Sequence, residues 1–218
     1  MQALDHRIAA WLSGLDLPLV TPLMKLASAV GAGGLVFVGI AFWMALARRR
    51  ITPAVAVLAA VFASQLLSNL MKDIVDRARP SVTYPDVHPV VRLPDSSSMP
   101  SGHAWIAFAA ATVLWVVIPA RRAWVVGLAA LIALSRVYLG VHYPSDVLVG
   151  AAGGVATGLV VLLGARLVHV HVGPDDDGDG RDQRQVDTPG GADGDAGRQR
   201  PTEVAGLRDD PVEHKQNR

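Results

Sequence analysis

The chain has 218 residues, of which 51% are hydrophobic and 18% charged, with a formal net charge of +1 and no cysteine. This length suits one domain, and the lack of cysteine excludes disulfides and thiolate chemistry. The small net charge hides an asymmetry. Residues 1–172 carry 13 Lys or Arg and 7 Asp or Glu, whereas residues 173–218 carry 7 and 12. The sequence therefore predicts two different parts that meet near Gly173.

The first part begins with an N-terminal region, 1–22, whose helical segment 3–13 is too short to cross a membrane. Residues 3–13 place apolar side chains at helical spacing among a few charges. This pattern predicts an interfacial helix with Trp11 at the level of the lipid headgroups. Pro18 and Pro22 are expected to break the chain before the first span.

Residues 23–172 contain long apolar runs typical of a membrane domain. A helix needs about 20 apolar residues to cross the hydrocarbon region. Five runs approach this length, at 26–47, 51–71, 104–120, 123–141 and 147–165. They predict an all-α, polytopic membrane bundle of five to six transmembrane helices. A soluble all-α protein is the alternative, and four long charge-free runs argue against it.

Short basic turns predict the orientation of this bundle. Arg48-Arg49-Arg50 joins the first two spans and Arg121-Arg122 joins the third and fourth. Such turns favour the cytoplasmic side, which places the N-terminus and the loop 73–102 outside and the tail inside. The proline-rich stretch 78–100 is expected to be an irregular cap without helix.

The tail, 173–218, is polar, acidic and too poor in apolar residues to bury a core, which predicts a disordered cytoplasmic segment. Asp175, Asp177 and Asp179 resemble the start of a calcium-binding loop. The bidentate Glu that such a loop needs at its twelfth position is replaced by Val186, so a solvated acidic segment is favoured.

Three polar clusters lie at the predicted outer ends of the spans. Charged residues are costly near a bilayer, so they indicate a functional site. The first contains Lys72 and Arg79, which share a face if the helix continues that far. Arg binds phosphate oxygens through a planar fork, and Lys acts as a point charge. The alternative is that both side chains only reach toward the headgroups. Arg77 and Arg92 are interpreted as solvent or headgroup contacts.

The second cluster is Ser101-Gly102-His103, which follows Pro100 and opens a helix. Free backbone N–H groups at a helix N-terminus favour an anion, and Gly102 permits a close approach. Ser101 adds a hydroxyl donor, and His103 lies in the first turn. A helix-capping or interfacial role is the alternative for His103.

The third cluster runs from Arg136 through His142 to Asp146. Asp146 can accept from one imidazole nitrogen of His142, which fixes the tautomer and leaves the other nitrogen free to attack. The alternative is that Asp146 only complements the helix dipole.

Together these residue types suit phosphoryl transfer, which needs cations on the equatorial oxygens, a nucleophile in line and an acid for the leaving oxygen. Three cations and two imidazoles meet those needs. The sequence offers no clustered carboxylates or thiolates for a metal. We therefore hypothesise a phosphohistidine route that uses no metal and no other cofactor.

Three motifs resemble the signature of the type 2 phosphatidic acid phosphatase family, which vanadium-dependent haloperoxidases share. They are Lys72-x6-Arg79-Pro80, Pro100-Ser101-Gly102-His103 and Ser135-Arg136-x5-His142-x3-Asp146. The resemblance implies that His142 attacks phosphorus, that His103 protonates the leaving group and that Asp146 orients His142. It also implies phosphate binding by the cations and by Ser101 and Gly102, namely Lys72, Arg79, Arg136, Ser101 and Gly102.

The resemblance implies a membrane phosphatase, and the orientation predicted from the basic turns places the site of this multi-pass cell-membrane protein on the extracytoplasmic side. Its expected partners are the bilayer and a lipid phosphate, namely phosphatidic acid, phosphatidylglycerol phosphate or a polyprenyl diphosphate, and no nucleic acid. Two alternatives stay open: a vanadate-dependent haloperoxidase, and a non-catalytic transporter or lipid-binding protein. Transmembrane runs argue against the first, and polar groups gathered at one face rather than at midplane argue against the second.

Overall fold

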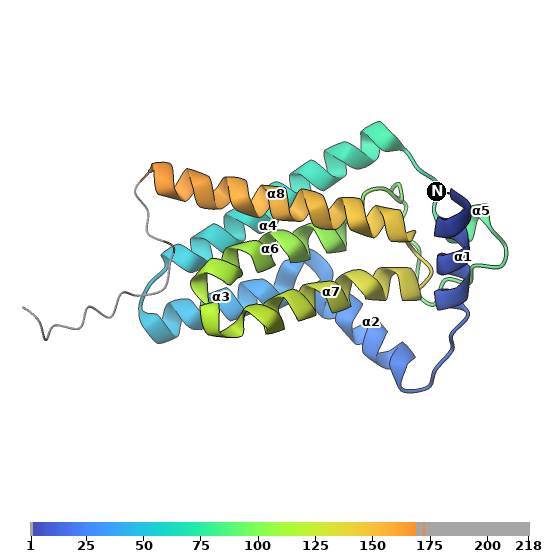
Figure 1. Ribbon diagram of the computed structural model, residues 1–218, viewed down its shortest axis with the longest axis horizontal. Coiled ribbons are helices and arrows are strands. Elements are labelled where there is room, and N and C mark those ends of the chain that lie inside the picture. The colour runs from blue at the N-terminus through green and yellow to red at the C-terminus, as the bar shows by residue number, and fades with distance from the viewer. Residues whose placement is uncertain (1, 169–171, 173–218) are drawn as a thin grey trace, which may run out of the picture. The chain divides into compact units, whose positions relative to one another are not determined.

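The computed structural model describes residues 2–168 and 172, and every regular element among them is a helix, as the sequence predicts (Figure 1). The longer helices run along one another as a bundle. The elements are α1 (Gln2–Ser13), α2 (Val20–Gly31), η1 (Ala32–Gly34), α3 (Leu35–Arg48), α4 (Thr52–Val75), α5 (Pro80–Thr83), α6 (Gly102–Val117), η2 (Pro119–Arg121), α7 (Arg122–Tyr138) and α8 (Pro144–Leu167). The predicted tail, 173–218, lies outside the described residues, as do its calcium-like aspartates.

The first predicted span begins earlier than expected. Helix α2 starts at Val20 and carries Pro22 in its first turn. A proline is tolerated there because the first N–H groups of a helix have no partner within the helix. The prediction that Pro22 breaks the chain before this span is therefore wrong.

The same span is also broken in the middle. Gly33 and Gly34 have φ angles of 59° and 71°, a conformation that glycine adopts without the steric cost of a Cβ. A Cβ on Gly34 would lie 2.8 Å from Cγ2 of Ile106 in α6. The break therefore lets the chain pass close to α6, and α2 and α3 follow as two helices instead of one.

Three helical segments are long and apolar enough to cross a membrane: Val20–Arg48, Thr52–Thr83 and Pro144–Leu167. They confirm three of the predicted spans. Helix α6 is apolar but has 16 residues, which rise about 24 Å, less than the roughly 30 Å of a hydrocarbon core. Membrane-spanning character is thus confirmed, and a total of five to six spans stays a prediction.

Helix α6 lies at the centre of the bundle and packs against α4, α7 and α8 (Figure 1). The approach of α8 is closest at Gly154, where a Cβ would lie 2.3 Å from the carbonyl oxygen of Trp105. Trp105 Nε1 also donates a hydrogen bond to Thr157 Oγ1 at 3.0 Å. This packing fixes the N-terminal ends of α6 and α8 beside each other.

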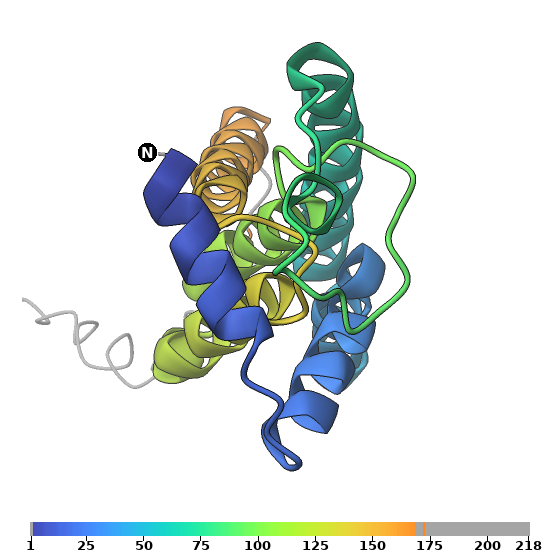
Figure 2. The same cartoon turned by 90° about the vertical axis from the view of Figure 1, so that its right-hand side faces the viewer.

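Helix α1 crosses the end of the bundle where α6 and α8 begin (Figures 1 and 2). It confirms the helix predicted at 3–13, and its interfacial position stays a prediction. The loop 78–100 runs over the same end. It contains α5, a one-turn helix that starts at Pro80, whose fixed φ suits the first helical position. The prediction that this loop contains no helix is therefore wrong.

Candidate active site

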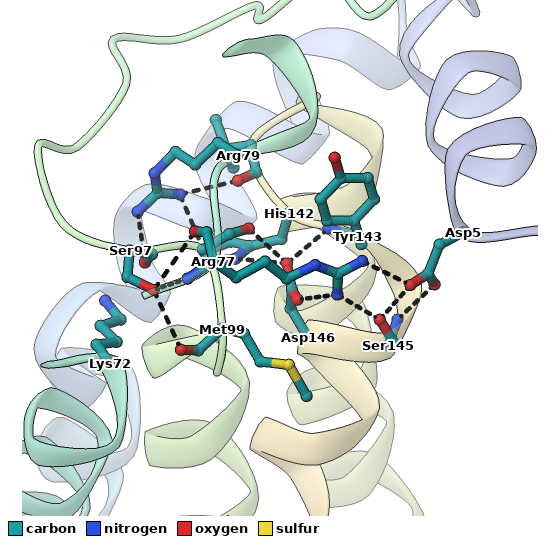
Figure 3. A network of polar contacts seen from close by, with 12 residues as sticks. Asp5, Lys72, Arg77, Arg79, Ser97, Met99, His142, Tyr143, Ser145 and Asp146 are labelled. Atoms are coloured by element: carbon teal, nitrogen blue, oxygen red, sulfur yellow. Dashed lines mark hydrogen bonds and ion pairs between the residues drawn. The ribbon is translucent and has the colours of Figure 1, made fainter. Parts of the chain in front are cut away.

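The three predicted clusters meet at the end of the bundle that α1 crosses (Figure 1), and Figure 3 shows residues of the first and third clusters close together. The backbone N–H of Ser101 donates to the carbonyl oxygen of Asp146 at 3.0 Å, which joins the second cluster to the third. Arg79 Nη1 lies 3.4 Å from His142 Nε2, which joins the first to the third. A Cβ on Gly102 would lie 3.9 Å from Lys72 Nζ, which joins the first to the second.

His142 and Asp146 are held by the start of α8. Pro144 is the first helical residue, and Asp146 forms a capping box with Tyr143. Asp146 Oδ2 accepts from Tyr143 N at 2.9 Å and from Ser98 Oγ at 2.5 Å. It lies 3.6 Å from His142 Nδ1, an ion-pair distance longer than a hydrogen bond. Asp146 therefore caps the helix, while His142 Nδ1 has no hydrogen-bond partner among the described residues, so the orienting role of Asp146 stays a prediction.

The imidazole of His142 lies in the interior, with 2% of the residue exposed. Burial lowers its pKa to about 4, because a charged ring is poorly solvated there, while the nearby Asp146 carboxylate acts in the opposite direction. His142 is therefore neutral at pH 7. A neutral imidazole with one free nitrogen lone pair is the form that can act as a nucleophile.

Lys72 and Arg79 lie close together because of a loop, and not because they share a face of one helix as predicted. Helix α4 ends at Val75, and Asp76 adopts the left-handed conformation, so the expected continuous helix from Lys72 to Arg79 is wrong. The loop that follows folds back instead. Ser96 Oγ accepts from Lys72 Nζ at 3.2 Å and from Arg79 Nη2 at 3.4 Å, and thereby bridges the two cations.

The guanidinium of Arg79 is buried and bonds mainly to main-chain carbonyls. Nη1 donates to the oxygen of Val141 at 2.8 Å, and Nε donates to the oxygens of Pro94 and Ser96 at 3.2 and 3.1 Å. These bonds hold the loop against the chain just before His142. Carbonyl dipoles satisfy donors without neutralising the charge, so Arg79 keeps a net positive field beside the imidazole.

Arg136 contributes a second buried cation from the last turn of α7. Its Nη1 donates to Ser28 Oγ in α2, and none of the described residues accepts from its Nε. Ser101 Oγ is likewise buried without a partner among residues 2–168 and 172. His103 is half-buried and interacts electrostatically with Arg136, His142 and Lys72. Arg136 Nε and Ser101 Oγ are thus donors without a partner among the described residues, whereas His103 also interacts with the backbone of Ser28.

The site as a whole suits a tetrahedral oxyanion. Buried cations are costly unless an opposite charge compensates them. Among the described charges that act on the His142 imidazole, two cations, Arg79 and Arg136, outnumber one carboxylate, Asp146, and Lys72 lies close enough to interact with both cations. A phosphoryl group would supply the missing negative charge and accept from the unpaired donors. The arrangement can therefore hold a phosphate against a neutral imidazole.

Sequence reasoning missed Arg77, which was interpreted as a solvent or headgroup contact. Its Nη1 donates to Asp146 Oδ1 at 2.7 Å and its Nη2 to Asp5 Oδ2 at 2.9 Å (Figure 3). That interpretation is wrong, because only 23% of the side chain is exposed and its guanidinium forms ion pairs with both Asp5 and Asp146. No local pattern could have shown this, since Asp5 and Asp146 are remote in sequence.

Sequence reasoning also missed Ser98, which donates to Asp146 at 2.5 Å. Here a signal existed, because Ser98 ends a run of three serines directly before Met99-Pro100 and the predicted anion site. Arg92 is exposed, as predicted.

Within the described ranges 2–168 and 172, no group of three or more His, Asp or Glu side chains is placed to hold a metal ion. The expectation of a reaction without metal stays a prediction, to be tested with a chelator.

Comparison with known proteins adds a family and a fold. The family model described as "PAP2 superfamily" matches residues 53–167. The decaprenylphosphoryl-5-phosphoribose phosphatase of Mycobacterium tuberculosis (strain ATCC 25618 / H37Rv) is 38% identical over 107 residues, which cover 47% of this chain and 56% of that protein. The chain thus spans about half the length of this curated relative.

Two solved structures share the arrangement of helices. The transmembrane PAP2 type phosphatidylglycerolphosphate phosphatase from Bacillus subtilis superposes with a TM-score of 0.64 at 26% identity, over 77% of this chain and 87% of that chain. Aquifex aeolicus LpxE gives a TM-score of 0.64 at 26% identity, over 72% of this chain and 93% of the other.

Proposed function

The chain belongs to the PAP2 superfamily, and on this premise we propose that it is an integral membrane phosphatase that removes phosphate from a lipid. The observation that carries the proposal is the neutral, buried His142 placed beside Asp146 and within 3.4 Å of Arg79. A buried imidazole surrounded by excess positive charge suits nucleophilic attack on an anionic phosphoryl group.

The proposed reaction has two steps. His142 Nε2 attacks phosphorus, the bond to the leaving oxygen breaks, and His103, which enters this step as the imidazolium form that the bound phosphate anion stabilises, gives that oxygen a proton. Water then attacks the phosphohistidine with His103 as general base, which releases inorganic phosphate and restores neutral His142. Asp146 faces Nδ1 and stabilises the positive ring that forms in the first step. No metal or other cofactor takes part.

The remaining residues bind the phosphoryl oxygens. Lys72, Arg79 and Arg136 neutralise the charge that spreads over these oxygens in the transition state. Ser101 Oγ, unpaired among the described residues, and the backbone N–H of Gly102 add hydrogen bonds at the start of α6. Because these donors are fixed before the substrate arrives, little reorganisation accompanies the reaction.

The substrate is a phosphorylated lipid, as a site at the end of a membrane bundle requires. The M. tuberculosis relative acts, by its name, on a decaprenyl-linked phosphoribose, and the B. subtilis structure on phosphatidylglycerol phosphate. Polyprenyl-linked phosphates, including a polyprenyl diphosphate, are therefore the class to test first, with phosphatidic acid and phosphatidylglycerol phosphate beside them.

We further propose that the site faces the extracytoplasmic side of the cell membrane. The basic turns Arg48–Arg50 and Arg121–Arg122 lie at the end of the bundle opposite the site (Figure 1). Basic turns favour the cytoplasm, so the site end lies outside and the chain after α8 begins on the inner side.

The test is phosphate release by the purified full chain from a panel of lipid phosphates in detergent or vesicles, with and without a chelator. We expect turnover that a chelator does not reduce. His142→Ala should lower kcat by at least about 10³-fold, because losing a covalent nucleophile removes the main route. Full activity of His142→Ala, or no release from any lipid phosphate, would contradict the proposal.

A further inference from the structure

Arg77 is a half-buried connection between the N-terminal helix and the carboxylate beside the nucleophile (Figure 3). Its Nη1 lies 2.7 Å from Asp146 Oδ1 and 2.7 Å from Ser145 Oγ, and its Nη2 lies 2.9 Å from Asp5 Oδ2. The guanidinium carbon also lies 3.9 Å from the centroid of the Tyr143 ring. Neither Arg77 nor Asp5 has a part in the reaction described above.

Asp5 reaches the start of α8 as well. Its Oδ1 accepts from the backbone N–H of Ser145 at 3.0 Å, and its Oδ2 accepts from Ser145 Oγ. The carboxylate of α1 therefore caps the same helical turn that carries Asp146. Asp5 is 8% exposed, so these bonds lie out of bulk water, where they are strong and costly to break.

These contacts define the orientation of the Asp146 carboxylate. Arg77 binds Oδ1, whereas Tyr143 N and Ser98 Oγ bind Oδ2. With both oxygens held from several directions, the carboxylate cannot rotate, and Oδ2 stays turned toward His142 Nδ1. Without Arg77, the buried Oδ1 of Asp146 would lose its charged hydrogen-bond donor, which is energetically costly. The carboxylate would then rotate toward another donor.

We propose that Arg77 is a positioning residue of the phosphatase reaction, and that Asp5 of α1 acts through it by anchoring its second guanidinium nitrogen. The inference rests on the proposed function and extends it. Arg77 orients Asp146, and Asp146 orients His142 with Nε2 toward phosphorus. The N-terminal helix α1 precedes the residues matched by the family model. Through Asp5 and Arg77 it helps to orient the nucleophile His142.

The proposal separates two kinds of cation in one loop. Arg79 lies beside His142 Nε2, on the side where phosphate binds, and its loss should weaken substrate binding. Arg77 is engaged by two carboxylates, Asp5 and Asp146, so it has little net charge to offer an anion. Its loss should slow the chemical step and leave the affinity for phosphate unchanged.

The experiment compares Arg77→Met with Arg92→Met, which removes the same charge from an exposed position in the same loop. Outer partners that orient ligands in metal sites contribute about 10- to 100-fold, and we expect a loss of this size in kcat for Arg77→Met. KM and the inhibition constant of orthovanadate should change less than about twofold, and Arg92→Met should resemble the wild type. Rapid-quench measurement should show slower formation of the phosphoenzyme.

A double-mutant cycle tests the part of Asp5. Asp5→Asn should lower kcat by about threefold or more, and the Asp5→Asn/Arg77→Met double variant should fall no further than Arg77→Met alone. Asp86→Asn is the matched control, because it removes the other polar contact of α1, the 2.9 Å pair of His6 and Asp86, without touching Arg77. Independent, additive losses would overturn the role of Asp5.

The outcomes also distinguish this inference from the proposed function. If His142→Ala is inactive and Arg77→Met keeps the wild-type kcat, or changes KM alone, only the positioning role fails. If His142→Ala is active, the proposed function fails first. Should Arg77→Met not fold, Arg77→Lys replaces it, since Lys keeps a charge but cannot bridge two carboxylates through a planar fork. A wild-type kcat for both Arg77→Lys and Asp5→Asn would overturn the inference.

Discussion

The two ends of the bundle both carry cations, but in opposite environments. At the site end Arg79 and Arg136 are 4% and 5% exposed. At the other end Arg48, Arg49 and Arg121 are exposed at the turns between helices. An exposed cation is solvated and has little energetic effect beyond orienting the chain in a membrane, whereas a buried one needs an anion. Burial, more than charge, therefore distinguishes the cations that we propose to bind phosphate from those that we propose to set the topology.

The largest effect at the site end is expected at His103. His103→Ala should lower kcat by about 10²- to 10⁴-fold for lipid phosphates, because an alkoxide leaves poorly without a proton. The loss should be much smaller for an aryl phosphate whose leaving group needs no proton. Phosphate release from both substrates measures the difference, with exposed His88→Ala as the control. An equal loss on both substrates would contradict the role of general acid.

The buried cations give the next largest effect. Arg136→Met should lower kcat/KM by about 10²-fold or more, since one preorganised contact to the phosphoryl oxygens is lost. Arg121→Met, the same change at the exposed end, should alter kcat/KM less than about twofold. Steady-state phosphate release with one lipid substrate measures both. Similar losses of kcat/KM in Arg136→Met and Arg121→Met would contradict the distinction between buried and exposed cations.

A third expected effect concerns stability, which should depend on pH. Burial lowers the pKa of His142 to about 4 from its ordinary 6.5. Between these values the unfolded chain binds a proton that the folded chain does not, so stability rises with pH through this window. The contribution is fully present above about pH 6.5 and is lost as pH falls toward 4, on the order of 3 kcal/mol in total.

This dependence can be measured as the Tm of the purified protein at pH 7 and pH 5. The wild type should lose more Tm on acidification than His142→Ala, which has no ring to protonate. The exposed His88→Ala serves as the matched variant and should follow the wild type. Equal losses of Tm in the wild type and in His142→Ala would contradict a lowered pKa of His142.

The sequence alone determined the elements whose causes are local. The charge-free run at 51–71 gave the helix Thr52–Val75, and the run at 147–165 gave Pro144–Leu167, because a helix satisfies its own backbone in an apolar medium. Pro144 and Asp146 indicated the start of α8 correctly, since capping depends on neighbours a few residues away. The three motifs also indicated which polar residues meet at one end.

How those residues are held depends on contacts between helices that are distant in the sequence. The chain breaks at Gly33 and Gly34 where it packs closely on α6, since a Cβ on Gly34 would lie 2.8 Å from Cγ2 of Ile106. The bridge from Asp5 through Arg77 to Asp146 joins residues at opposite ends of the described chain. Such contacts leave no periodic or local trace in a sequence, because they depend on where the packing of α6 against α8 places the N-terminal turn of α8 relative to α1.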